Sequence, residues 1–188
     1  MKASITSSGS KYYAYVLVYV DDILIIDKDP SKHMDTLRDN YTVKPESIGE
    51  PKIYLGADIN KVFYPDGSYA WAMGSTSYTK AAIKNVKKFL ADHNLCFNKK
   101  LSDPLYTPNN PFSTQDYRSE LDVSNECDDF LTSYFQNLIG VLRWIVELGR
   151  IDIAFEVSTL SKYLAFPRTG HVYQALHIFK YLEMHINN

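Results

Sequence analysis

The feature that most constrains the fold of this chain is a pair of adjacent aspartates, Asp21 and Asp22, set between two apolar runs. The runs occupy residues 13–20 and 23–27 and are rich in Tyr, Val, Ile and Leu. Because their apolar residues do not alternate with polar ones, the pattern predicts two short strands buried on both faces. Adjacent carboxylates repel each other and are costly to bury. The sequence therefore predicts a hairpin that carries both acids at its tip.

Two interpretations of the acidic tip are open on the dipeptide alone. Aspartate is common in tight turns, because it tolerates left-handed backbone and bonds to its own chain. Carboxylates are also the hard oxygen ligands that magnesium prefers. Two such ions stabilise the attacking and leaving oxygens of nucleotidyl transfer, and a bound cation offsets the repulsion within the pair. The apolar flanks favour the metal site over a plain surface turn.

The remainder of the first third predicts a helix and a second hairpin. Asp29 followed by Pro30 is a typical helix start, with the aspartate as N-cap, and the helix is expected to run to about Asn40. Residues 52–64 predict a strand, "PDG" at 65–67 a turn, and "SYAWAM" at 68–73 the returning strand.

The second half has a helical pattern. Apolar residues after Ser77 recur at helical spacing, at Ala82, Ile83, Val86, Phe89 and Leu90. Residues 98–128 are rich in Pro, Asn, Ser and Asp and are expected to form a mobile acidic linker. Three further helices are expected at about 129–148, 151–165 and 170–185. The predicted fold class is α+β, with antiparallel hairpins and a helix followed by a helical region.

Overall charge gives no support to nucleic-acid binding, since the net charge is -2 and the pI about 6.2. A local basic surface is nevertheless available. Four lysines of the predicted helix after Ser77 lie on one face: Lys80, Lys84, Lys87 and Lys88. Such a stripe either follows a phosphate backbone or is the solvated side of an amphipathic helix.

The sequence also indicates an intracellular protein. The only cysteines, Cys96 and Cys127, are unsuited to a disulfide scaffold. Residues 1–11 are Ser-rich, are expected to be disordered, and lack the apolar core of a signal peptide. The apolar run that follows is interrupted by two acids, so no membrane span is expected. We expect a cytoplasmic or nuclear location, with no membrane partner. The five histidines show no metal-ligand spacing, and His171 and His177 are expected on different helix faces.

Several segments, taken in order, resemble one family. "YVDDILI" at 19–25 resembles the catalytic hairpin of reverse transcriptases. Behind it come four segments in the family's order: "YLGADI" at 54–59, "SYTKAAIKNVKKFL" at 77–90, "TP" at 107–108, and the tail from 134 to 182. Over residues 12–186 the chain resembles a copia-type retrotransposon reverse transcriptase. That resemblance implies a C-terminal part of the palm at 12–76, a thumb-like helix at 77–97, the linker at 98–128, and a helical thumb or connection region at 129–188.

The resemblance also implies roles for the hairpin residues. Asp21 would be a direct ligand of the two magnesium ions that the intact family uses, and Asp22 would support it. Tyr19 and Val20 would lie beside the primer end or the incoming deoxynucleotide. The partners would be an RNA or DNA template with its primer, together with deoxynucleotides.

The resemblance implies further nucleic-acid contacts outside the hairpin. Tyr54, Leu55 and Gly56 would help position the primer strand, because glycine lets the backbone approach a nucleic acid closely. Without the family order, the same three residues would indicate a plain strand with a bulge. The lysine stripe would lie near the duplex.

The chain departs from the family in three ways. The third catalytic aspartate belongs to an earlier strand, but no acidic residue precedes Asp21. The ribonuclease H domain expected after the tail does not follow. Ile151 stands where the family has a proline. We therefore expect a fragment of a polyprotein, with upstream palm and fingers elsewhere, and little or no polymerase activity. The alternatives are a non-catalytic nucleic-acid-binding remnant and an inert structural or interaction domain.

Overall fold

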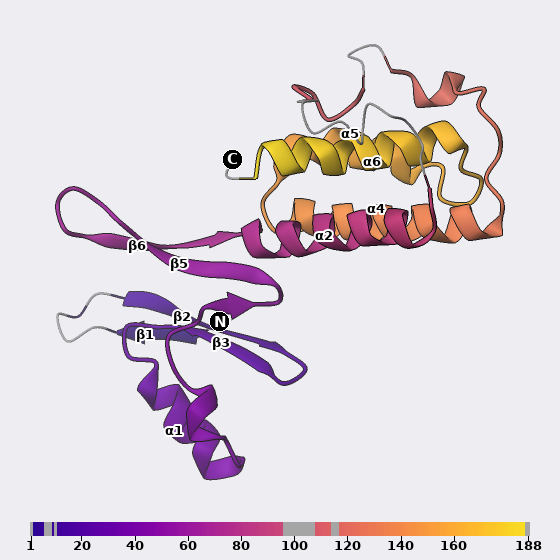
Figure 1. The fold of residues 1–188 in the computed structure, drawn as a ribbon. Helices are drawn as coiled ribbons and strands as arrows, with labels where there is room; N and C mark the ends of the chain where they lie inside the picture. Colours follow the sequence, from indigo (N-terminus) through magenta and orange to yellow (C-terminus); the bar gives the residue numbers. More distant parts are fainter. Residues whose placement is uncertain (1, 6–8, 10, 96–107, 114–116, 187–188) are drawn as a thin grey trace. The chain divides into compact units, whose positions relative to one another are not determined.

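A computed structural model describes residues 2–5, 9, 11–95, 108–113 and 117–186 (Figure 1). Two three-stranded antiparallel sheets and, in these described residues, five α-helices confirm the predicted α+β class. The chain divides into two compact units. The first comprises the described residues up to Leu55 together with Ile59–Trp71, and the second comprises Gly56–Asp58 and the described residues from Ala72 onward.

The first sheet has the order β1 (Lys2–Ile5), β2 (Lys11–Tyr19), β3 (Asp22–Ile26). The predicted hairpin of β2 and β3 is confirmed, with antiparallel pairing from Tyr15 opposite Ile26 to Tyr19 opposite Asp22. Residues 2–5 differ from the expected disorder, because they pair with residues 11–14 as an additional strand. Residues 1, 6–8 and 10 lie outside the described residues, so the disorder expected for them remains a prediction.

The prediction that these strands are buried on both faces is wrong. In β2 only Ala14 is buried, and Val18 exposes 64% of its surface. A strand is buried only where another layer covers its face, and the described residues of this unit supply no such layer for β2. The apolar side chains of β2 are therefore exposed in this unit, although their composition is typical of a buried strand.

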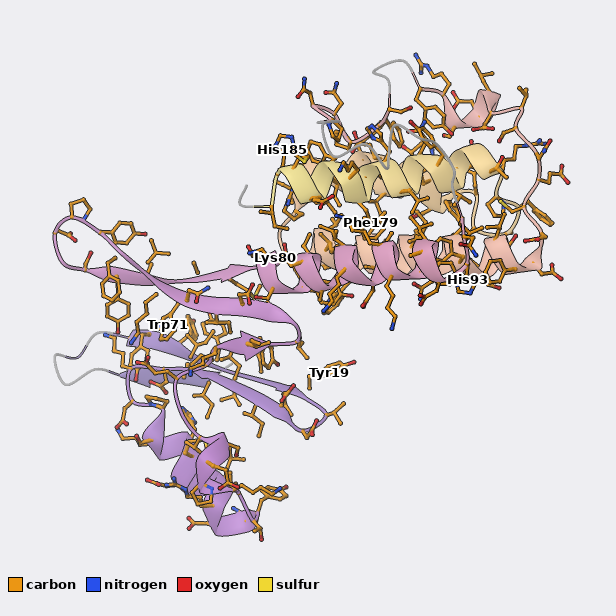
Figure 2. The ribbon with its side chains drawn as sticks, in the orientation of Figure 1. Tyr19, Trp71, Lys80, His93, Phe179 and His185 are labelled. Atoms are coloured by element: carbon orange, nitrogen blue, oxygen red, sulfur yellow. The ribbon has the colours of Figure 1, made fainter. Side chains whose placement is uncertain are left out.

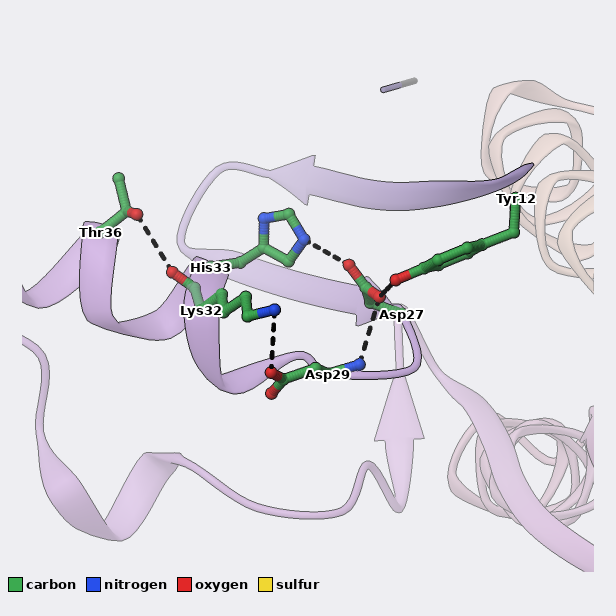
Figure 3. Close-up of polar contacts among 6 residues, drawn as sticks. All are labelled: Tyr12, Asp27, Asp29, Lys32, His33 and Thr36. Atoms are coloured by element: carbon green, nitrogen blue, oxygen red, sulfur yellow. Dashed lines mark hydrogen bonds and ion pairs between the residues drawn. The ribbon is translucent and has the colours of Figure 1, made fainter. Parts of the chain in front are cut away.

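Helix α1 (Ser31–Asn40) follows β3 and is tied to the sheet by Asp27 (Figure 3). The Asp27 carboxylate accepts hydrogen bonds from Tyr12 Oη at 2.8 Å and from the Asp29 backbone amide at 3.2 Å, and its other oxygen lies 2.6 Å from His33 Nε2. The His33 bond, followed by the Tyr12 bond, lowers the pKa of Asp27 to about 2. The predicted cap by Asp29 is wrong, because Pro30 occupies the N-cap position and the Asp29 side chain pairs with Lys32 instead.

The second sheet has the order β4 (Ile53–Tyr54), β5 (Ala57–Phe63), β6 (Tyr69–Gly74). The β5–β6 hairpin was predicted, but the single strand expected over residues 52–64 is interrupted by a turn at Leu55 and Gly56. Lys61 lies over the rings of Tyr69 and Trp71, at 5.0 and 4.9 Å from their centroids.

The second unit is helical and holds most of the core. Its helices are α2 (Thr76–Asp92), α4 (Asp129–Glu147), α5 (Ala154–Ser161) and α6 (Thr169–Met184), with a 3₁₀ turn, η3 (Ile151–Ile153), before α5. The inner faces of α4 and α6 supply the most buried side chains, among them Phe135, Leu142, Ile178 and Leu182. The helix expected at 151–165 is shorter than predicted, since it begins as a 3₁₀ turn and ends at Ser161. Among the described residues, no helix combines the length and apolar character needed to cross a bilayer.

Residues 108–113 and 117–128, which we call the strap, differ from the mobile linker that their composition suggested. The strap contains a short 3₁₀ turn, η2 (Ser119–Leu121), and buries Phe112 and Ser119. Glu126 forms an isolated antiparallel bridge with Arg168, at the start of α6. Polar side chains of α6 bind the strap backbone, and composition alone cannot reveal such tertiary bonds. The rest of the expected linker, residues 98–107 and 114–116, lies outside the described residues.

Candidate catalytic hairpin

The tip of the β2–β3 hairpin is a two-residue turn. Tyr19 and Asp22 are paired across the strands, so only Val20 and Asp21 form the loop. Val20 has a φ of 54°, in the left-handed region that β-branched residues rarely adopt. A position of this kind in a tight hairpin usually favours glycine, asparagine or aspartate. Holding valine there costs about 1–3 kcal/mol, the range for backbone strain of the kind often found at functional sites.

The turn presents its polar groups to solvent. Asp21 and Asp22 are exposed, as are Tyr19 at 59% and Val20 at 86% (Figure 2). Because Tyr19 and Asp22 are directly opposite, their side chains share one face of the hairpin. Neither carboxylate has a hydrogen bond or an ion pair with another described residue. Both acids are therefore available to an incoming cation.

The donor set at the tip fits magnesium but does not complete a site. Carboxylate oxygens are suitable ligands, and magnesium usually retains several waters beside one or two carboxylates. In the part of the chain that the structure describes, no group of three or more His, Cys, Asp and Glu side chains could hold a metal. A magnesium ion at the tip would need ligands in addition to these two carboxylates.

The motif Tyr54–Leu55–Gly56 forms the turn between β4 and β5. Leu55 and Gly56 have φ values of 50° and 82°, so both central residues are left-handed, which is typical of a type I′ hairpin turn. The alternative of a plain bulged strand is wrong. A Cβ atom on Gly56 would lie 3.3 Å from Tyr78 Cδ2 and 3.6 Å from Trp144 Nε1, so glycine is favoured by space as well as by backbone angle.

The four lysines of α2 are all exposed but do not form one free stripe. Lys87 pairs with Glu183 of α6. Lys80, Lys84 and Lys88 recur every fourth residue and have no ion-pair partner among the described residues. Of the four lysines predicted to form the stripe, these three therefore remain available to a polyanion.

Sequence reasoning did not find a groove between α2 and α4. It has a volume of about 590 Å³ and is lined mainly by apolar side chains, among them Tyr78, Phe89, Phe130 and Tyr134. The rings of Phe89 and Tyr134 stack, with centroids 3.9 Å apart. Ala82, Val86 and Phe89 of the predicted apolar helix face line this groove, and their helical spacing is the signal that the sequence offers.

Comparison with curated proteins gives matches along most of the chain. The chain is 26% identical over 171 residues to a putative transposon Ty5-1 protein of Saccharomyces cerevisiae, covering 89% of this chain and 48% of that protein. It is 25% identical over 175 residues to a retrovirus-related Pol polyprotein from transposon RE1 of Arabidopsis thaliana, and 27% identical over 171 residues to the polyprotein from transposon RE2. These matches support an origin in a retrotransposon polyprotein.

The retrotransposon relatives are longer than this chain. It spans about half the length of the yeast protein and a tenth of each plant polyprotein. No family model matches the sequence, and no solved structure matches it.

Proposed function

We propose that this chain is a segment of a retrotransposon RNA-directed DNA polymerase. The segment comprises the C-terminal part of the palm and a helical thumb-like region. In the intact enzyme the reaction would add deoxynucleotides to a primer 3′ end, templated by RNA or DNA. Two magnesium ions held in part by Asp21 and Asp22 would stabilise the charge that develops on the transferred phosphate.

The observation that carries this proposal is the strained acidic turn. A hairpin that needed only to reverse direction would place glycine or asparagine at position 20. Here valine is held at a φ of 54° while two adjacent carboxylates remain without a protein partner among the described residues. Such an arrangement suits a metal site, because it holds two carboxylates near each other and leaves both accessible to a cation. The similarity to Pol polyproteins supports the same assignment.

Divalent-ion binding at the tip tests this proposal directly. Manganese, a paramagnetic substitute for magnesium, is expected to broaden the amide resonances of residues 19–23 at millimolar concentrations. Asp21→Asn with Asp22→Asn should abolish the broadening. A matched pair of exposed aspartates on α1 supplies the control, so Asp35→Asn with Asp39→Asn should leave it unchanged. Absence of broadening at the tip in the unmodified chain contradicts the proposed metal site.

Polymerisation itself is expected to need more than these 188 residues. With two carboxylates at the tip and no third among the described residues nearby, the two-metal arrangement lacks ligands. The chain should therefore give little or no primer extension with magnesium and a primed RNA template. Clear DNA synthesis by the chain alone would refute this expectation.

A second candidate function is nucleic-acid binding without catalysis. The free row Lys80, Lys84 and Lys88 favours it, because exposed unpaired cations release counterions from a phosphate backbone. Binding to a primer–template duplex would then weaken with salt and be indifferent to Asp21→Asn. Charge reversal of Lys80 and Lys84 should weaken binding at least several-fold. Reversal of Lys87, already paired with Glu183, should have the smaller effect.

A further inference from the structure

The strap is held by a row of polar side chains on α6. His171, Gln174 and His177 expose 1–3% of their surfaces. His177 Nδ1 lies 2.9 Å from the Pro111 carbonyl, Gln174 Oε1 accepts from the Ser113 amide at 2.9 Å, and His185 Nε2 lies 3.2 Å from the Pro108 carbonyl. His171 and His177, which are six residues apart in the helix, bind different parts of the strap backbone, Ser119 and Pro111.

Both ring nitrogens of His171 have assigned roles. Its Nδ1 lies 3.0 Å from the backbone nitrogen of Arg168, and an amide N–H can only donate. Its Nε2 lies 3.0 Å from the Ser119 carbonyl oxygen, which can only accept. The ring must therefore be neutral, with its proton on Nε2. His171 thus takes the place of the glutamate or glutamine of a capping box at the start of α6.

We propose that His171 is an acid-sensitive latch that releases the strap from the start of α6 when its ring takes up a second proton. A proton from solvent would occupy Nδ1, where it would face the Arg168 N–H. The ring must then turn away, and the bond to Ser119 in the strap is lost with the cap. At 1% exposure, no water can replace either partner while the strap stays in place.

The release is expected to spread because further bonds join the strap to the same end of α6. Arg168 Nη1 donates to the Ser124 carbonyl at 2.6 Å, and the Gly170 amide donates to Ser124 Oγ at 2.8 Å. The Thr169 amide donates to the Asn125 carbonyl at 2.9 Å. These bonds depend on the position of residues 168–170, which the His171 cap fixes.

The groups that face His171 define how the latch responds. The rings of Tyr163 and Phe135 pack against it at centroid distances of 4.2 and 6.4 Å, and neither ionises in mild acid. Asp122 of the strap is a nearby anion whose attraction opposes release. Bonds from Tyr117 and from Ser124 hold its carboxylate in place.

His177 Nδ1 and His185 Nε2 donate to carbonyl oxygens, and bonds of that kind survive protonation of the ring. The latch belongs to His171, and it does not depend on any function of the Asp21–Asp22 hairpin.

Hydrogen exchange on the full chain tests the latch. Between about pH 7.5 and about pH 5, where histidines titrate, the protection factors of strap amides such as Asp122 and Cys127 should fall. One linked proton gives a fall that approaches tenfold per pH unit at the acidic end of this range. Amides in the middle of α4 should keep their protection. Strap protection that stays constant over this range would overturn the proposal.

Two variants separate the latch from ordinary acid destabilisation. In His171→Gln the new side chain can accept from the Arg168 amide and donate toward Ser119 without titrating, so strap protection should become independent of pH. His177→Gln is the matched control and should retain the response of the unmodified chain. An equal pH response in His171→Gln refutes the proposal. If that variant does not fold, imidazole nitrogen shifts of the unmodified chain decide, because a doubly protonated His171 with the strap still protected is incompatible with the latch.

Discussion

Gly170→Ala tests the packing of the strap on α6 most sharply. A Cβ atom at this position would lie 1.9 Å from Asp122 Oδ2 and 2.6 Å from its Cγ, whereas real Cβ contacts are essentially never shorter than 3.0 Å. The carboxylate must therefore move by more than 1 Å. It cannot do so freely, because Tyr117 Oη and the amide and hydroxyl of Ser124 donate to it.

The expected magnitude follows from these bonds. Hydrogen bonds to a charged acceptor contribute about 1.5–3 kcal/mol each, and the displacement should break one or two of them. Alanine is favoured over glycine inside a helix by about 1 kcal/mol, which offsets part of the loss. Gly170→Ala should thus lower the free energy of unfolding by about 2–4 kcal/mol in urea denaturation.

A matched glycine in the same unit supplies the control. A Cβ atom on Gly140, within α4, would meet nothing within 4 Å. Gly140→Ala should therefore raise the free energy of unfolding by about 0.5–1 kcal/mol, through helix propensity alone. In an Asp122→Ala background, which has already lost the carboxylate and its bonds, Gly170→Ala should cause no further loss. If Gly170→Ala stabilises the chain as much as Gly140→Ala does, the reasoning about the strap is refuted.

Three further changes test other parts of the structure. Val20→Gly should raise the free energy of unfolding by about 1 kcal/mol, since glycine adopts a φ of 54° without strain; an unchanged or lower value in urea would contradict the assigned turn. Asp27 has a pKa lowered to about 2 by its bonds to His33 and Tyr12, so its contribution to stability is complete above its ordinary value of 3.8 and is lost as pH falls through 2. Asp27→Asn should flatten that part of the stability curve in acid titrations, and an unaltered curve would exclude the cluster as its source. Ile151→Pro removes the hydrogen bond from the Ile151 amide to the Gly149 carbonyl, so it should lower the free energy of unfolding by about 1 kcal/mol. A higher melting temperature for this variant would contradict that expectation and show that the fixed φ of proline outweighs the lost bond.

The hairpin could be predicted from the sequence because its determinants are local. Two apolar runs separated by an acidic pair fix the pairing, and Tyr19 and Asp22 are indeed opposite each other. Its burial could not be predicted in the same way. The apolar runs are typical of a buried strand, but burial of β2 depends on whether another layer packs on it, and such a layer comes from residues distant in sequence or from another molecule.

Other features were missed because their causes are tertiary. Leucine at position 55 gives no sign that it adopts left-handed backbone, so the turn at Leu55–Gly56 was mistaken for a continuous strand. The strap was interpreted from its prolines and acids as a linker. Its order comes from bonds such as that between His171 and Ser119, 52 residues apart, which no local pattern records.

The division of the chain into two units affects how it can be dissected experimentally. The chain crosses from one unit to the other three times, after Leu55, after Asp58 and after Trp71. Neither unit is therefore a continuous piece of sequence. A cut at residue 72 would take Gly56–Asp58 away from the helical unit, including the glycine that packs against Tyr78 and Trp144. A shortened chain meant to contain the helices should instead begin before β4, so that it includes all three strands of the second sheet.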